Sequence, residues 1–357
     1  METVTVNLGP RSYPIVIGTG LLANVGSLLC KQGLHPGPVA IVTDSIVGPL
    51  YKKEVSDSLV QTDFQPIVIE IPSGEEHKNL TWLSFIYDKL IDGSLERRSP
   101  LIALGGGVVG DLTGFAAATF QRGVPFVQIP TTLLAQVDAS VGGKTAIDHR
   151  AGKNLIGAFY QPRLVVIDVA TLSTLPEREF RAGVAEVIKY GVILSPDLFT
   201  LLEQQMERLF RLDPELLSEV IKTCCQLKAQ VVEEDETESD YRAILNFGHT
   251  LGHAIETATG YTQYLHGEAV AIGMAFALSL SQQRRLCDKA LPERVYRLLK
   301  NAGLPFMVPS ELKGEHLIAG MKTDKKITEG KVKFVCVEEL GKTRFEHLSV
   351  REISAYL

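Results

Sequence analysis

Short apolar runs rich in valine and isoleucine recur through the first half of the chain, and each ends in turn or charged residues. They are VAIVTD at 39–44, QPIVIEIPSGE at 65–75, LIALGGG at 101–107, FVQIPTT at 126–132 and LVVIDV at 164–169. Helical stretches separate several of them, as in LTWLSFIYDKLIDG at 80–93. Strands that alternate with helices predict a largely parallel α/β sheet. Such a sheet binds its ligand beyond the carboxyl ends of its strands.

The pattern changes after TLSTLPEREF at 171–180, where long stretches of helical periodicity begin. The tail KVKFVCVEELGKTRFEHLS alternates on both sides of Gly341 and predicts a small hairpin. Because the 357 residues are more than twice the ~150 of a common domain, we expect two domains. We place an α/β domain at 1–176 and a mainly helical domain at 177–357, with a shared site in the cleft between them.

Composition and charge exclude several classes of protein. The chain is 45% hydrophobic and 22% charged, as in ordinary globular proteins. Its formal net charge of −6 argues against general nucleic-acid binding, so any basic site must be local. The N-terminus lacks the pattern of a signal peptide, and no apolar run of about 18 residues predicts a membrane span. Five cysteines without CxxC spacing favour buried thiols in a reducing compartment, and we expect the cytoplasm.

Gly105, Gly107 and Gly110 match the pattern G-x-G-x-x-G directly after an apolar strand. Such glycines let the backbone approach a pyrophosphate at a helix N-terminus, although a purely structural turn is an equal alternative. The acidic residue that ordinarily follows about 20 residues later is missing. Asp44, at the end of an earlier strand, could contact the ribose instead, and the strand order would then differ from the usual Rossmann order.

The segment DASVGGKT at 138–145 nearly matches G-x-x-x-x-G-K-[ST], the loop that cradles nucleotide phosphates. Asp138 replaces its first glycine, and TTLLAQV precedes it where a strand is required, so an ATPase is disfavoured. The segment gathers polar side chains among glycines, which suits an anion site. A solvated basic loop is the alternative. The anion-binding candidates are Lys144, Arg150, Lys153 and Asn154, together with Arg122 in FQRGVPF.

Histidines and carboxylates gather in the second half. His249 and His253 are four residues apart and would share one face of a helix, and His266 follows at a turn with Glu256 and Glu268 nearby. Three protein ligands with one open position suit a zinc site, while ordinary surface or packed histidines are an equal alternative. Glu186, in the apolar AGVAEVIKYGVIL, is a further ligand candidate, although it could form only a surface ion pair with Lys189.

These pieces, in this order, closely resemble the 3-dehydroquinate synthase family of sugar phosphate cyclases. The resemblance runs from about Asp44 to Lys326. It rests on PSGEEHK at 72–78, GGGVVGD at 105–111, QIPTTLLAQVDASVGGKTAID at 128–148, GKNLIGAFYQP at 152–162, GVAEVIKYG at 183–191 and LNFGHTLGHAIE at 245–256.

The resemblance implies a Rossmann-like NAD-binding domain, a mainly helical second domain, and a zinc ion that cobalt can replace. It assigns Glu186, His249 and His266 as the metal ligands and moves His253 to the substrate. The implied NAD contacts are Asp44, Ser73, Gly74, Glu75, Glu76, His77, Lys78, Gly105, Gly106, Gly107, Val108, Val109, Gly110, Asp111, Thr131, Thr132, Lys144, Lys153, Thr171, Leu172, Ser173 and Thr174. The implied substrate contacts are Arg122, Asp138, Lys144, Lys153, Asn154, Lys189, Lys228, Arg242, Asn246, His253 and one or both of Lys325 and Lys326.

The activity that the resemblance implies is the conversion of 3-deoxy-D-arabino-heptulosonate 7-phosphate to 3-dehydroquinate and phosphate. Its steps are transient oxidation by NAD, phosphate elimination, re-reduction, ring opening and an intramolecular aldol closure. In the family, the arginine that matches Arg122 can come from a partner subunit, so a homodimer is expected. The rivals are cyclases whose substrates lack the carboxylate, a metal-dependent polyol dehydrogenase, and a non-catalytic NAD-binding module.

Overall fold

A computed structural model describes residues 1–312, 314–322, 327–328 and 331–356. It contains two compact units, each built from two pieces of the chain. Unit 1 comprises Met1–Leu175 and Pro214–Thr237, and unit 2 comprises Pro176–Asp213 and Glu238–Leu357. No helix among these residues is long and apolar enough to span a membrane.

The sheet of unit 1 has seven strands in the order β1-β2-β9-β6-β5-β3-β4. All neighbouring strands are parallel except β1 and β2. The strands are β1 (Glu2–Val6), β2 (Tyr13–Gly18), β3 (Pro38–Asp44), β4 (Gln65–Ile71), β5 (Leu101–Gly105), β6 (Phe126–Pro130) and β9 (Leu164–Asp168). All five predicted apolar runs are therefore strands, and the expected parallel α/β sheet is confirmed.

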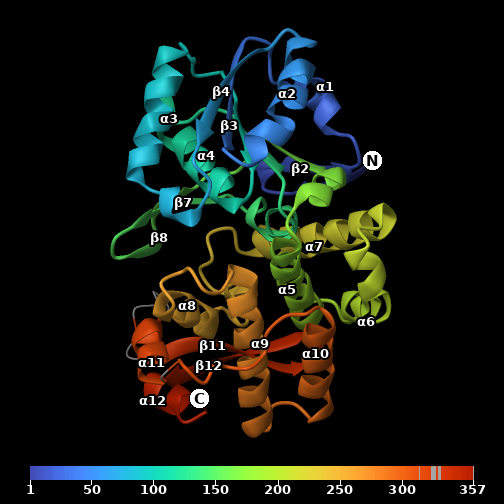
Figure 1. The fold of residues 1–357 in the computed structure, drawn as a ribbon, viewed down its shortest axis with the longest axis vertical. Helices are drawn as coiled ribbons and strands as arrows, with labels where there is room; N and C mark the ends of the chain where they lie inside the picture. The colour runs from blue at the N-terminus through green and yellow to red at the C-terminus, as the bar shows by residue number, and fades with distance from the viewer. Residues whose placement is uncertain (313, 323–326, 329–330, 357) are drawn as a thin grey trace. The chain divides into compact units, whose positions relative to one another are not determined.

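Strand β3 shows how the sheet is covered, because its residues face two hydrophobic clusters in alternation. Ile41 packs with α1 (Val25–Lys31) and α2 (Val47–Val60) on one face. Ala40 and Val42 pack with α3 (Leu80–Asp92) and α4 (Gly107–Thr119) on the other. The two helix pairs flank the sheet in Figure 1. Both faces of the strand are apolar because both are buried.

The order of the parallel strands determines where this unit can bind a nucleotide. Taken in chain order, β3, β4, β5, β6 and β9 form the arrangement 2-1-3-4-5, which differs from the usual Rossmann order as expected. The direction of winding reverses between β3 and β5, since β4 lies on one side of β3 and β5 on the other. Doubly wound sheets bind ligands at this reversal.

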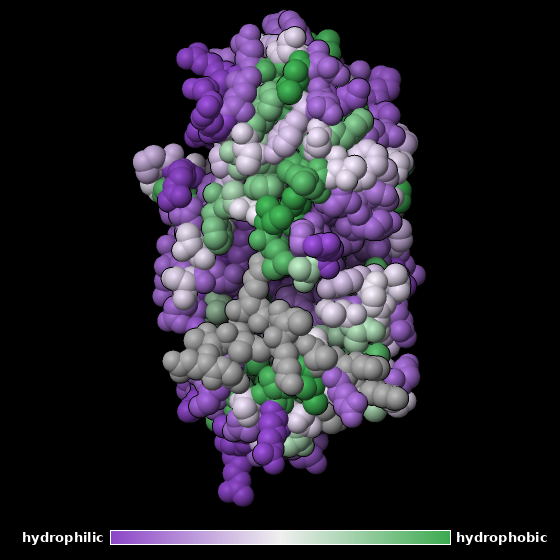
Figure 2. All heavy atoms as spheres, turned by 90° about the vertical axis from the view of Figure 1, so that its left-hand side faces the viewer, coloured by the Kyte–Doolittle hydropathy of each residue, from purple (hydrophilic) through white to green (hydrophobic). Residues whose placement is uncertain are grey.

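Two antiparallel strands, β7 (Lys144–His149) and β8 (Gly152–Phe159), form a hairpin beside the main sheet. The residues before it form a π-helix, Ala135–Ala139, which confirms that a strand is missing where an ATP-binding loop would need one. Figure 2 faces the side that carries α3 and the hairpin, and hydrophobic residues reach the surface there. The exposed ones on these elements are Leu80, Ile91, Leu155, Ile156 and Phe159.

Unit 2 is mainly helical, as the periodicity predicted. Its helices are α5 (Glu177–Ile193), α6 (Pro196–Phe210), α8 (His249–Ala258), α9 (His266–Gln283), α10 (Ala290–Asn301), α11 (Gly314–Lys322) and α12 (Val350–Ser354). Strand β11 (Lys331–Glu339) pairs antiparallel with β12 (Lys342–Ser349), so the predicted hairpin is confirmed, and β10 (Ile327–Thr328) extends it. Gly341 takes φ +78° at the turn, a conformation that favours glycine.

Helix α7 (Pro214–Glu234) belongs to unit 1, although its sequence position is within the helical half. It contacts β1 and β2, and its Lys222 pairs with Glu2. Its apolar face, which includes Val220 and Cys224, is buried. Periodicity predicts that such a helix has a buried face, but it does not predict which sheet or helix that face packs on. The return of α7 to the first unit therefore could not be predicted from the sequence.

Candidate cofactor, substrate and metal sites

The residues expected to bind NAD follow the carboxyl ends of the parallel strands in unit 1. Asp44 ends β3, Gly105 ends β5, and Thr131 and Thr132 follow β6. The segment Ser73 to Lys78 follows β4, and the 3-10 helix η6 (Val169–Thr174) follows β9. Asp44 and Gly105 thus end the two strands between which the winding reverses. This is the edge at which the fold predicts a ligand.

The glycine loop opens α4, which begins at Gly107 and has no side-chain cap at Gly106. Helix N-termini of this kind present backbone N–H groups that bind phosphate. Packing also favours glycine at Gly105, where a Cβ would lie 2.7 Å from Val109 Cγ2 and 2.9 Å from Val109 Cβ. A Cβ on Gly110 would lie 2.9 Å from Gln128 Oε1, the end of a flexible side chain. The structural and functional explanations of this loop are therefore compatible.

Asp44 is already engaged in local structure. Its Oδ1 accepts hydrogen bonds from the backbone N–H groups of Ile46 and Val47, at 2.8 and 2.9 Å, just before α2. At the end of η6, Thr174 Oγ1 lies 2.6 Å from Oη of Tyr51 on α2. Both expected NAD contacts are held by neighbours of the same unit, which fixes their positions.

Lys78 is buried and lies at the centre of a polar network whose other members are partly or fully exposed. Its Nζ forms an ion pair with Asp111 and donates a hydrogen bond to Asn154 Oδ1 at 2.6 Å. Burial opposes its charge, but Asp111 and Glu75 outweigh that effect and raise the pKa of Lys78. Lys153 Nζ lies 3.3 Å from Glu75 Oε1. Expected NAD contacts and expected substrate contacts are therefore directly linked within unit 1.

The remaining cations of unit 1 differ in exposure. Lys228, on α7, is buried and forms an ion pair with Asp138, and its Nζ also donates to the Asp138 carbonyl at 2.6 Å. Lys144, at the start of β7, is exposed, and so is Arg122, which has φ +68° in the turn after α4. Lys325 and Lys326 lie outside the described residues.

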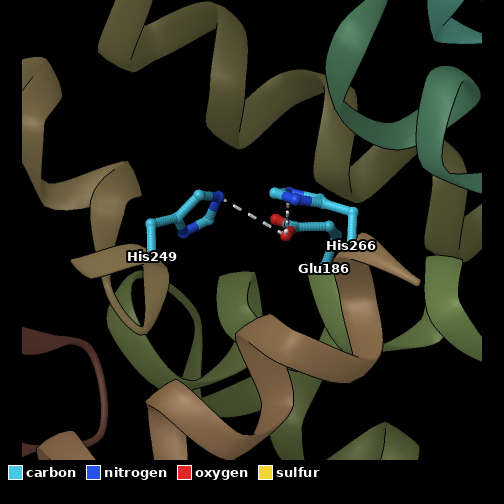
Figure 3. A group of neighbouring side chains, drawn as sticks. All are labelled: Glu186, His249 and His266. Atoms are coloured by element: carbon cyan, nitrogen blue, oxygen red, sulfur yellow. Dashed lines mark ion pairs between the residues drawn. The ribbon is translucent and has the colours of Figure 1, made fainter. Parts of the chain in front are cut away.

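Glu186, His249 and His266 come together in unit 2, with ligand atoms that all lie within 4.8 Å of one another. Figure 3 shows both imidazole rings directed at the Glu186 carboxylate. The Nε2 atom of each histidine lies 3.7 Å from Glu186 Oε1. Glu186 is 1% exposed and forms an ion pair with Lys189, which is also 1% exposed. One carboxylate and two imidazoles match the donor set of a catalytic zinc site.

Close packing of α9 on α5 brings His266 to Glu186. A Cβ on Gly267 would lie 1.9 Å from the Ala182 carbonyl oxygen, so only glycine allows this approach. Glu268 accepts the backbone N–H of Leu265 at 2.9 Å and pairs with Arg178 at 2.7 Å. The first turn of α9, which carries His266, is therefore tied to the first turn of α5.

Further expected substrate contacts lie near this cluster along the chain. His253 stands with Glu256 and His266 in a second group of possible ligands. Its ring centroid is 5.5 Å from that of His249. Arg242 is 1% exposed, and Asn246 Nδ2 donates to Glu238 Oε1 at 2.9 Å. The two histidines of the HxxxH pair thus lie on one face of α8, as expected. They belong to different groups of possible ligands, so both need not bind the same ion.

Known proteins match the chain over its whole length. Residues 68–182 match the N-terminal family profile of 3-dehydroquinate synthase, and residues 183–327 match the C-terminal one. The 3-dehydroquinate synthase of Pelobacter propionicus is 52% identical over 99% of this chain and 98% of its own length. The 3-dehydroquinate synthase of Desulforamulus reducens is 52% identical over 100% of this chain and 99% of its own length. The chain belongs to the 3-dehydroquinate synthase family.

Solved structures of related cyclases share the fold of this family member. A 2-deoxy-scyllo-inosose synthase complexed with carbaglucose-6-phosphate, NAD+ and Co2+ has a TM-score of 0.91 at 26% identity and covers 99% of this chain and 98% of its own. The 2-epi-5-epi-valiolone synthase of Streptomyces hygroscopicus, with NAD+ and Zn2+ bound, has a TM-score of 0.88 at 29% identity. The match covers 96% of this chain and 95% of that one. The family that the sequence motifs indicated is confirmed, and so is the predicted fold class, an α/β domain followed by a mainly helical one.

Two carboxylates of this 3-dehydroquinate synthase family member received no specific role from the sequence. Asp148 Oδ1 accepts the Asn154 backbone N–H at 2.8 Å, and no motif or spacing points to this contact. Glu256 Oε2 lies 3.3 Å from His266 Nδ1. Its place three residues after His253 and seven after His249 puts it on the same helical face, so the periodicity could have singled it out.

Proposed function

We propose that this chain is a 3-dehydroquinate synthase, which converts 3-deoxy-D-arabino-heptulosonate 7-phosphate to 3-dehydroquinate and phosphate. The observation that carries the proposal is the 52% identity to the Pelobacter propionicus synthase over nearly the whole of both chains. The net reaction eliminates phosphate, so the enzyme would be a carbon–oxygen lyase of the shikimate pathway. We also propose the cytoplasm as its location, because the five free cysteines support a reducing compartment.

The loops at the carboxyl ends of the strands in unit 1 support NAD as the cofactor. The N-terminus of α4 would offer backbone N–H groups to the pyrophosphate, and Asp44 would be near the ribose. When bound, NAD supplies a reversible oxidation of the substrate, so the net reaction is not redox. The chain itself would hold and orient the cofactor through this loop and through Lys78.

The donor set of Glu186, His249 and His266 supports one Zn2+ or Co2+ ion per chain. When bound, such an ion acts as a Lewis acid on substrate hydroxyl groups. The chain's contribution is to keep two imidazoles and a buried carboxylate directed at one point. The Lys189 ammonium balances the Glu186 charge, since an unpaired buried carboxylate is costly.

The proposed substrate explains why a chain of net charge −6 gathers cations locally. This substrate carries a carboxylate and a phosphate, and both anions bind cationic donors through charge-assisted hydrogen bonds. We propose that the side chains that the family resemblance assigns to the substrate bind and orient its carboxylate and its phosphate. In this role they would neutralise the leaving phosphate and hold the ring for closure.

We also propose that the enzyme is a homodimer in which Arg122 serves the partner subunit. Its side chain is exposed on the turn after α4. The exposed Leu155, Ile156 and Phe159 of the β8 strand support an additional partner surface on unit 1, because exposed apolar groups of this kind often mark interfaces.

Related cyclases that act on sugar phosphates without a carboxylate are the nearest rivals. Lys228, Arg242, Asn246 and His253 all remain in this chain, and they are expected to be lost when no carboxylate is bound. The test compares phosphate release from two substrates. One is the heptulosonate, and the other is a heptulose 7-phosphate that carries a hydroxymethyl group in place of the carboxylate. Release from the heptulosonate alone supports the synthase, and preference for the hydroxymethyl compound contradicts it.

A polyol dehydrogenase is the more distant rival, because glycerol dehydrogenases share the fold at 14 to 16% identity. Incubation with NAD and glycerol, followed at 340 nm, separates the two activities. The proposal predicts no sustained rise in absorbance. A continuing rise would mean that NADH is released as a product, and the synthase assignment would fail.

A further inference from the structure

The imidazole of His266 lies between two carboxylates that face its two ring nitrogens. Its Nε2 is 3.7 Å from Glu186 Oε1, and its Nδ1 is 3.3 Å from Glu256 Oε2. His249 is arranged in the same way: its Nε2 is 3.7 Å from Glu186, and its Nδ1 is 3.1 Å from the Phe247 carbonyl oxygen. In both rings Nε2 lies toward the Glu186 carboxylate, as Figure 3 shows. In both rings Nδ1 lies within hydrogen-bond distance of an acceptor.

We infer that Glu256 is a positioning residue of the proposed metal site, because its carboxylate accepts the Nδ1 proton of His266 and thereby directs the Nε2 lone pair toward the ion. A histidine that binds a metal through one nitrogen commonly donates its other N–H to a carboxylate or carbonyl. That donation fixes the tautomer and the orientation of the ring, and it makes the coordinating nitrogen a stronger base. The inference deepens the proposed function and rests on its metal site.

The packing of α8 and α9 keeps this carboxylate in place. Glu256 is 4% exposed, and its charge requires compensation at such a depth. The two helices approach closely at Gly273, where a Cβ would lie 1.9 Å from the Gly248 carbonyl oxygen. A Cβ on Gly252 would lie 3.2 Å from the Ala269 carbonyl oxygen. Because the helix backbones are in contact, Glu256 on α8 can reach His266 on α9.

A different role for Glu256 would be direct ligation of a second ion with His253 and His266, whose ligand atoms also lie within 4.8 Å of its own. His266 would then have to give up its Nδ1 proton while Nε2 serves the first ion. A neutral imidazole has one lone pair for a metal and one N–H for a partner, so the positioning role needs no further deprotonation. The two roles predict different numbers of bound ions.

The test measures the affinity for Zn2+ or Co2+ by competition with a chromophoric chelator, with the full-length protein and without substrate. Glu256→Ala should weaken binding by about 10- to 100-fold at an unchanged one ion per chain. Glu256→Gln should lie between this variant and the wild type, because its amide oxygen still accepts the Nδ1 proton. The visible spectrum of bound Co2+ should change in Glu256→Ala, since the His266 ring loses its orientation.

Two controls separate positioning from folding. Glu207→Ala removes a carboxylate that is 91% exposed on α6, and it should leave the metal affinity unchanged. The melting temperature of the metal-free protein should be similar in all variants, and if Glu256→Ala fails to fold, the comparison rests on Glu256→Gln.

Three results would overturn the inference or its basis. Wild-type affinity in Glu256→Ala would show that Glu256 does not position His266. Two ions in the wild type and one in Glu256→Ala would make Glu256 a ligand instead. If the wild-type chain binds no divalent ion, the proposed metal site itself is contradicted. This outcome differs from the first two, which concern only the role of Glu256.

Discussion

Lys78 donates a hydrogen bond from its Nζ to Oδ1 of Asn154, 2.6 Å away, and so links the loop after β4 to the β7–β8 hairpin. The first residue is an expected NAD contact and the second an expected substrate contact. Because Lys78 also pairs with Asp111 of α4, the hairpin is fixed relative to the helix that the glycine loop opens.

Asn154→Gly should lower kcat/KM for the heptulosonate by about 10- to 100-fold, because a hydrogen bond to a charged group is worth about 1.5–3 kcal/mol. Asn154 has φ +53°, which glycine adopts easily and alanine does not. Asn154→Ala should therefore lose about 1 kcal/mol or more of unfolding free energy in addition. Steady-state kinetics and urea denaturation check both effects. Wild-type kcat/KM in Asn154→Gly would contradict the role of this contact.

Gly267→Ala should weaken metal binding and lower the free energy of unfolding by about 1–3 kcal/mol. Its Cβ would lie 1.9 Å from the Ala182 carbonyl, and the backbone that carries His266 must then move away from α5. Gly314→Ala is the matched control, since nothing lies within 4 Å of a Cβ at that position. Chelator competition and denaturation measure the two effects. Equal results for both variants would show that the α5–α9 contact does not position the ligand.

Thiol modification should distinguish the cysteines by burial. Desolvation raises the pKa of Cys225 to about 12 and that of Cys336 to about 11. At pH 8, well below both values, the thiolate that reacts is scarce, and both side chains are also shielded from reagent. Mass spectrometry after brief alkylation should find Cys30, which is exposed, modified first. Rapid modification of Cys225 in the folded protein would contradict this burial.

Mixed subunits test the proposed exchange of Arg122. Arg122→Ala and His266→Ala should each have little activity alone. If Arg122 serves the partner's site, dimers formed from the two variants contain one site with every residue intact, and a random mixture should recover about a quarter of wild-type activity. Refolding the variants together and assaying phosphate release measures this. Activity no higher than that of the separate variants would place Arg122 in its own subunit's site, or outside the site.

The sequence predicted those features that depend on local pattern. The strands of the first half, the helices of the second and the hairpin around Gly341 follow from periodicity and turn residues. Local pattern made Glu186 and the histidines ligand candidates, but the choice of Glu186, His249 and His266 as one set came from the family resemblance, because nothing local links Glu186 to residues more than 60 positions away. The return of α7 to unit 1 and the contact of Glu256 with His266 depend on tertiary packing. Spacing shows which residues share a helical face but not what that face meets.

The most direct test of the proposed function is the stoichiometry of the reaction with 3-deoxy-D-arabino-heptulosonate 7-phosphate, NAD and Zn2+. The account predicts one phosphate and one 3-dehydroquinate per substrate consumed, no net rise in absorbance at 340 nm, and loss of both products on chelation with recovery when Zn2+ or Co2+ is restored. Phosphate release without 3-dehydroquinate, NADH that accumulates with turnover, or full activity after verified metal removal would contradict it.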